Sequence, residues 1–193
     1  LYQQAQAQFK TKAPHVNADT REQFIAHTAI TADLYWRRQL RITYLQALSH
    51  LPITVYGEGW DQVITNHKGG IQFRPPLPYQ KALEAYQSAK MVLNLFPAGY
   101  SFHERLFDSF ASSAVPITFW TKDATAFLDV KSLTCQLGRT AESAANNVET
   151  ALNQPDELAQ KARLGHEWLI NNWTDNHRST AYITIAKEQG WIE

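Results

Sequence analysis

Residues 91–96 read MVLNLF, an almost wholly apolar run with the length of a β-strand. A run of this kind, without alternation, is typical of a central strand whose two faces are both buried. Residues 103–114 follow with helical spacing of their apolar positions, and residues 115–120, VPITFW, form a second apolar run. A strand, a helix and a strand in this order predict a βαβ unit and therefore a parallel sheet.

The same alternation continues on both sides of this unit. The further elements that the sequence predicts are strands at 53–57, 71–74 and 133–137 and helices at 79–89, 124–128 and 140–186. Pro155 and Asn172 are expected to break the last of these helices. We therefore expect the α/β class, with an open parallel sheet of about five strands, helices on both faces, and extra helices at both termini.

Residues 1–50 are expected to form an N-terminal helical segment that packs on the sheet domain of residues 51–193. Asp19 and Glu22 have the spacing of a capping box, which predicts a helix start with Asp19 as the N-cap. Residues 28–31 include three β-branched side chains, so this segment is either two helices or one bent helix.

Composition limits the classes of function. The chain has 193 residues, of which 44% are hydrophobic, and 18 Lys and Arg balance 18 Asp and Glu. This balance argues against general charge attraction to nucleic acid or anionic membranes. A single cysteine, Cys135, favours a reducing compartment, and no apolar run reaches the ~20 residues of a transmembrane helix, so we expect a cytoplasmic protein. Because the chain starts at Leu1 and its only methionine is Met91, we expect a fragment of a larger protein.

The connection that follows MVLNLF is the expected binding site, because ligands of open parallel sheets bind beyond the carboxyl ends of the strands. Ser101 is expected to cap the next helix, with Glu104 completing a capping box. A helix N-terminus attracts anions, and the guanidinium of Arg105 can bind a phosphate through two hydrogen bonds. Asp108, one turn later, can accept hydrogen bonds from a sugar diol. These features suit a nucleoside diphosphate, although the three-residue spacing equally allows Arg105 and Asp108 to pair with each other.

Other chemistries lack their sequence patterns. His103 and Glu104 begin like a zinc-protease motif, but Phe107 stands where the second histidine ligand belongs. The sequence has no Cys/His cluster with zinc spacing, no phosphate-binding P-loop, no GxGxxG fingerprint, no GxSxG elbow and no Asp-x-Asp pair. We therefore expect neither a bound metal nor a cofactor.

Four short segments carry a more specific signal. They are Tyr56-Gly57 with Trp60; PLPY at 76–79 with AYQSA at 85–89 and LNL at 93–95; HERLFD at 103–108 with ASSAVPI at 111–117; and WTDNHR at 173–178. In this order they resemble the CgeB-type, or spore-maturation-like, glycosyltransferases of the GT-B class, from about Arg41 to Ile185. Ser113 replaces a glycine of that family, which a helix end without a left-handed residue tolerates.

The resemblance implies the C-terminal, donor-binding, Rossmann-like domain of a two-domain enzyme. Such enzymes transfer a sugar from a nucleotide sugar to an acceptor without a bound metal, and the implied partner is the N-terminal acceptor-binding domain of the same polypeptide. Arg105 would hold the diphosphate, Asp108 the ribose, and the base would lie beyond the strands that end at Gly57 and Arg74. The other residues expected at this site are Tyr79, Tyr100, Ser101, His103 and Glu104.

An alternative is a non-catalytic Rossmann-like module that serves interaction or nucleotide binding within a larger protein. Tyr100 stands where many GT-B enzymes have a sugar-binding glutamate, which favours this alternative, as does Ser113. The presence of both Arg105 and Asp108 argues against it.

Overall fold

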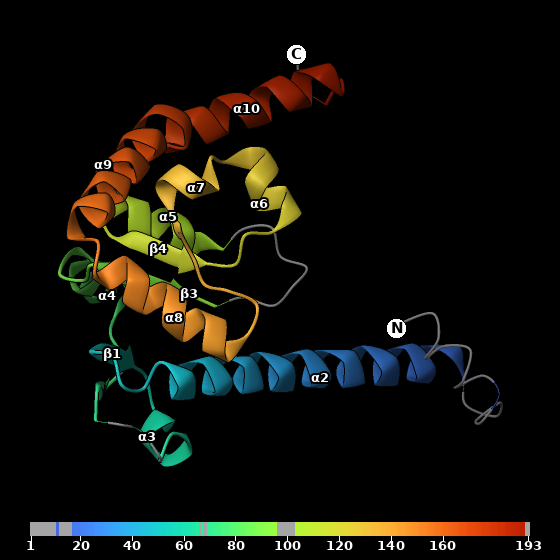
Figure 1. Ribbon diagram of the computed structural model, residues 1–193. Helices are drawn as coiled ribbons and strands as arrows, with labels where there is room; N and C mark the ends of the chain where they lie inside the picture. Colours follow the sequence, from blue (N-terminus) through green and yellow to red (C-terminus); the bar gives the residue numbers. More distant parts are fainter. Residues whose placement is uncertain (1–10, 12–16, 66, 68, 96–102, 192–193) are drawn as a thin grey trace. The chain divides into compact units, whose positions relative to one another are not determined.

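The computed structural model describes residues 11, 17–65, 67, 69–95 and 103–191 (Figure 1). The chain divides into two compact units, Leu1–Thr43 and Tyr44–Glu193. We call these the first unit and the second unit.

The first unit contains most of one long helix, α2 (Ala18–Ala47). The side-chain oxygen of Asn17 accepts a hydrogen bond from the backbone N–H of Thr20 at 2.8 Å, so the prediction of Asp19 as the N-cap is wrong. The hydroxyls of Thr28 and Thr31 donate to carbonyl oxygens one turn earlier, at 2.8 and 2.9 Å. Because these hydroxyls are satisfied within the helix, the β-branched residues do not divide it in two.

The described residues of the second unit form five strands, each parallel to its neighbours in the same sheet. They are β1 (Ile53–Tyr56), β2 (Ile71–Arg74), β3 (Met91–Asn94), β4 (Val115–Thr118) and β5 (Cys135–Gln136). β1 pairs with β2 in one sheet, and β3, β4 and β5 form a second sheet in that order. Asn94 pairs with Thr118, which pairs with Gln136, so these three residues form one row at the carboxyl edge of the second sheet. The predicted α/β class with about five parallel strands is confirmed, with the strands divided between two sheets.

Helices connect and follow the strands. They are α3 (Trp60–Val63), α4 (Tyr79–Gln87), α5 (Glu104–Ala111), α6 (Lys122–Phe127), α7 (Val130–Leu133), α8 (Ala141–Leu152), α9 (Pro155–Asn172) and α10 (Asp175–Glu188). The predicted breaks at Pro155 and Asn172 are confirmed. The sequence pattern predicts neither α3 nor α7, which have four residues each. Among the described residues, none of the helices combines the length and the apolar character that a membrane crossing requires.

Among the described residues, two apolar clusters hold the elements of the second unit together. The buried members of the larger cluster are Leu106, Phe110, Ala124, Leu128, Val130 and Leu133, from α5, α6 and α7 and the adjoining turn. Leu164 and Trp168 of α9 pack against it. The smaller cluster joins Leu45, Ile64 and Ile71, and Leu93 of β3 packs against it. Since Leu106 and Phe110 are both buried, α5 is packed along one side against its neighbours.

Candidate functional site

The site begins with the N-terminus of α5. The imidazole Nδ1 of His103 accepts a hydrogen bond from the backbone N–H of Arg105 at 3.2 Å, so His103 is the N-cap and Glu104 is the first helical residue. The prediction that Ser101 caps this helix is therefore wrong, because the imidazole occupies that role. Ser101 and Tyr100 lie outside the described residues.

The polar side of α5 carries the predicted ligand residues. Leu106 and Phe110 are buried in the larger cluster, which leaves Glu104 exposed and Arg105 and Asp108 half-buried. This arrangement follows from the helical period, since residues on the side opposite the core face solvent. Arg105 and Asp108 therefore lie on a helix that is packed along its other side, and both are partly exposed to solvent.

Asp108 is held by a residue from the preceding helix. The hydroxyl of Tyr79 donates to Oδ1 of Asp108 at 2.8 Å. Tyr79 is the first residue of α4, and its side chain is 64% exposed. This hydrogen bond is the main reason that the pKa of Tyr79 is raised, with smaller effects of desolvation and of the charges of Asp108 and Glu104. The raised pKa favours the protonated phenol, so the donor of this hydrogen bond stays in place at neutral pH.

Arg105 and Asp108 do not pair with each other. Within the described residues, no carboxylate lies within ion-pair distance of the Arg105 guanidinium, and the partner of Asp108 is Tyr79. The pairing that the three-residue spacing allows is therefore not formed. The backbone N–H of Leu106 donates to the carbonyl of His103 at 2.9 Å, so this amide, like that of Arg105, is already bonded. A half-buried guanidinium without an acidic partner among the described residues, at the positive end of a helix, is an arrangement suited to an anion.

Gly57 and Arg74 lie together at the carboxyl ends of β1 and β2. The backbone N–H of Gly57 donates to the carbonyl of Arg74 at 3.0 Å, and the guanidinium of Arg74 donates to the side chain of Gln72 at 3.2 Å. Gly57 has φ 139°, and a Cβ there would lie 2.9 Å from Nε1 of Trp60. This position therefore requires glycine. The hydrogen bonds of Gly57 and Arg74 given above join residues of the β1–β2 sheet and do not involve α5.

One polar residue of this region was not among the predicted site residues. Asn94, the last residue of β3, is only 1% exposed, and neither Oδ1 nor Nδ2 of its side chain has a hydrogen-bond partner among the described residues. The signal in the sequence is its place as the one polar residue of the apolar run MVLNLF. Buried side chains of this type are almost always hydrogen-bonded, so this one calls for an explanation.

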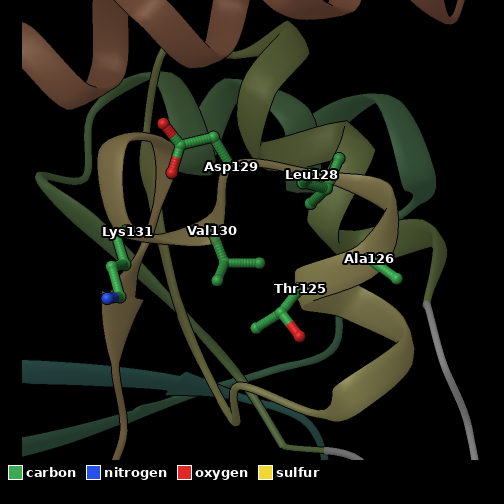
Figure 2. Close-up of a pocket in the computed structure, with 6 residues that line it drawn as sticks. All are labelled: Thr125, Ala126, Leu128, Asp129, Val130 and Lys131. Atoms are coloured by element: carbon green, nitrogen blue, oxygen red, sulfur yellow. The ribbon is translucent and has the colours of Figure 1, made fainter.

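A hollow of about 490 Å³ lies elsewhere, at the turn between α6 and α7 (Figure 2). It is lined by Thr125, Ala126, Leu128, Asp129, Val130 and Lys131. Figure 2 shows the charged ends of Asp129 and Lys131 directed away from each other. Asp129 caps α7 by accepting a hydrogen bond from the N–H of Ser132, and its hydrogen bonds to Ser132 lower its pKa. The carboxylate therefore has a structural role, and the lining includes none of the predicted site residues.

The described residues contain no group of three or more His, Cys, Asp and Glu side chains that could together hold a metal ion. In a comparison with protein families, the model of a family described as glycosyl transferase-like matches residues 37–184, which is more than half of the chain. A search of curated proteins found no match. The matched range includes Asn94 and all the predicted site residues, which run in sequence from Gly57 to Asp108.

Proposed function

Because the chain belongs to the glycosyl transferase-like family, we propose that its second unit binds the nucleoside diphosphate of a sugar donor at the start of α5. The observation that carries this proposal is the half-buried guanidinium of Arg105, which has no acidic partner among the described residues and lies beside the N-terminal amides of the helix. Within the family, the resemblance to CgeB-type enzymes supports the GT-B class and the role of a C-terminal donor-binding half.

The diphosphate is bound by two sources of positive charge. The N-terminus of α5 offers about half a positive charge, and Arg105 adds a planar pair of donors. As the bond to the anomeric carbon breaks, negative charge grows on the leaving phosphate. Fixed donors aimed at that charge stabilise the transition state, so this part of the reaction needs no metal ion.

The ribose is bound by Asp108. A carboxylate has about four acceptor sites, so Asp108 can accept a hydrogen bond from Tyr79 and others from the ribose hydroxyls. Tyr79 fixes the direction of the carboxylate, while His103 and Glu104 flank the phosphates at the first turn of α5. The base lies toward Gly57 and Arg74.

The N-terminal domain of the same polypeptide binds the acceptor and supplies the group that activates it. Sugar transfer then takes place between the two domains, in the cytoplasm and without nucleic acid or a membrane-spanning segment. In this proposal the chain binds the sugar donor and stabilises the leaving group, while the N-terminal domain binds and activates the acceptor.

The test is the affinity of Arg105→Ala for nucleoside diphosphates. Calorimetry with UDP, GDP and TDP identifies the nucleotide that the wild-type chain binds. The variant should bind it roughly 10- to 150-fold more weakly, because a hydrogen bond to a charged group contributes about 1.5–3 kcal/mol. Arg163→Ala is the matched control, since Arg163 is exposed on α9 and pairs with Glu167 at 2.9 Å. Its affinity should equal that of the wild type.

Two results would contradict the proposal. Equal affinity of Arg105→Ala and the wild type would move the phosphates away from α5. Failure of the wild-type chain to bind any of the nucleotides would favour the non-catalytic module.

A further inference from the structure

Asn94 combines deep burial with unpaired polar atoms. Its side chain is 1% exposed, and the neighbouring Val92 and Leu95 are both 6% exposed. Neither the oxygen nor the nitrogen of its amide has a partner among the described residues. Burial removes water from these atoms without replacing it, which costs free energy comparable to that of a lost hydrogen bond for each atom.

The position of Asn94 places it at the carboxyl edge of the second sheet. Asn94 and Thr118 are paired at the ends of β3 and β4, and the hydroxyl of Thr118 donates to the backbone carbonyl of Asn94 at 3.4 Å. α5 contacts both strands, and the proposed phosphate site is at the N-terminus of this helix. The unpaired amide is therefore on the edge of the sheet at which a nucleotide sugar would bind.

The chemistry of the amide selects one part of that ligand. An amide side chain offers two donors and a carbonyl acceptor, so both atoms are satisfied only by a group that also donates and accepts. Phosphate oxygens only accept, and they would leave Oδ1 unpaired. In the proposed function the ribose hydroxyls are already bound by Asp108. Hydroxyls of the transferred sugar both donate and accept.

We propose that Asn94 binds a hydroxyl of the transferred sugar and thereby contributes to the choice of that sugar. This inference rests on the proposed function, because it takes the diphosphate at α5 as given. It separates the roles of the residues: Arg105 recognises the leaving group, and Asn94 recognises the group that is transferred.

The test compares the nucleotide sugar with the matching nucleoside diphosphate in Asn94→Leu, a variant of similar volume without polar atoms. Calorimetry on the full chain should show about 10-fold weaker binding of the nucleotide sugar, the loss expected for one or two hydrogen bonds, and unchanged binding of the diphosphate. The thermal midpoint of the variant without ligand should equal or exceed that of the wild type, because the variant no longer buries unpaired polar atoms. Asn94→Ala provides the same comparison of ligands if leucine does not fit.

Thr118→Val is the matched control, since it changes a buried polar residue of the same edge and should affect both ligands equally. A lower thermal midpoint of Asn94→Leu with the same ratio of affinities as the wild type would show a structural role and overturn the inference. Equal weakening of both ligands would overturn it as well. If Arg105→Ala weakens both ligands while Asn94→Leu weakens neither, only this inference fails. If the wild-type chain binds neither ligand, the proposed function fails with it.

Discussion

Ser113 has a backbone conformation that serine rarely adopts. Its φ is 54°, and among the residues that the structure describes it is the one non-glycine residue with a positive φ. The N–H groups of Ser113 and Ala114 donate to the carbonyls of Phe110 and Ser109, at 3.1 and 2.9 Å, and close the end of α5. The helix end does contain a left-handed residue, so the condition under which serine would be tolerated without cost is not met.

Replacing Ser113 by glycine should stabilise the protein. A left-handed conformation costs a residue with a Cβ about 1–2 kcal/mol, and the greater flexibility of glycine in the unfolded chain returns about 0.5–1 kcal/mol of that. We expect Ser113→Gly to raise the free energy of unfolding by about 0.5–1 kcal/mol, measured by urea denaturation. Ser113→Ala keeps the Cβ and should give no gain. A gain of equal size in the alanine variant would mean that the strain is not the cause.

Local patterns predict some residues of the site better than others. The helical period predicts that Arg105 and Asp108 face away from the core, and they do. The cap at His103 was not predicted, because histidine is not among the usual capping residues. Tyr79 was expected at the site only through the family resemblance, since its bond to Asp108 joins residues 29 positions apart, and no local pattern specifies such a contact.

At the scale of elements, the close packing of α5 and α9 depends on a glycine. Gly165 is buried within α9, and a Cβ built there would lie 2.5 and 2.8 Å from two ring atoms of Phe110. The carbonyl of Phe110 is also 3.1 Å from the imidazole Nδ1 of His166. The two helices therefore meet at van der Waals distance, which positions α5 and with it the proposed phosphate site.

Gly165→Ala should destabilise the protein, although alanine is the better helix former. The helix gains about 1 kcal/mol from the substitution, while overpacking against a fully buried ring costs about 1–3 kcal/mol. We expect a net loss of about 1 kcal/mol in urea denaturation. The control is the double variant Gly165→Ala with Phe110→Leu. The smaller leucine leaves room for the alanine methyl group, so the double variant should lose less stability than the sum of the two single variants. A stabilising Gly165→Ala would show that α9 can move away without cost.

Whether the sequence pattern predicts an element depends on the length of that element. The strands predicted at 91–96 and 115–120 correspond to the shorter β3 (Met91–Asn94) and β4 (Val115–Thr118), and residue 96 lies outside the described residues. They could be predicted because an apolar run between loops is a strong pattern. The breaks near Pro155 and Asn172 could be predicted because proline and asparagine limit helices. α3 and α7 are one turn each, too short for a helical period to be visible. The division of five strands into two sheets depends on hydrogen bonds between distant segments, which no local pattern contains.

At the scale of the whole molecule, every element of the proposed site lies in the second unit. Its boundary at Tyr44 falls within α2, and the hydroxyl of Tyr44 donates to the carbonyl of Gly138 at 3.2 Å. The ring of Tyr44 meets that of Phe119 edge to face, with 5.5 Å between the centroids. The last turn of α2 is therefore part of the packed second unit, and the family match begins nearly two turns before it, at residue 37.

A fragment of residues 37–193 should fold and bind the same nucleotide as the full chain. It keeps both apolar clusters, all five strands and nearly two turns of helix before Tyr44. We expect one cooperative transition in urea and an affinity within about 2-fold of that of the full chain. A fragment starting at residue 53 is the control and should be less stable, because it lacks Leu45 and Tyr44. Loss of cooperative unfolding in the longer fragment would show that residues 1–36 are needed for folding.

The hydrogen bond between Tyr79 and Asp108 joins helices that follow different sheets: α4 comes after β2, and α5 comes after β3. A displacement of one sheet relative to the other would therefore change the direction of the Asp108 carboxylate, the group that we propose binds the ribose. Motion between the two sheets and the proposed binding of the nucleoside would thus depend on each other through the hydrogen bond that the phenol of Tyr79 donates.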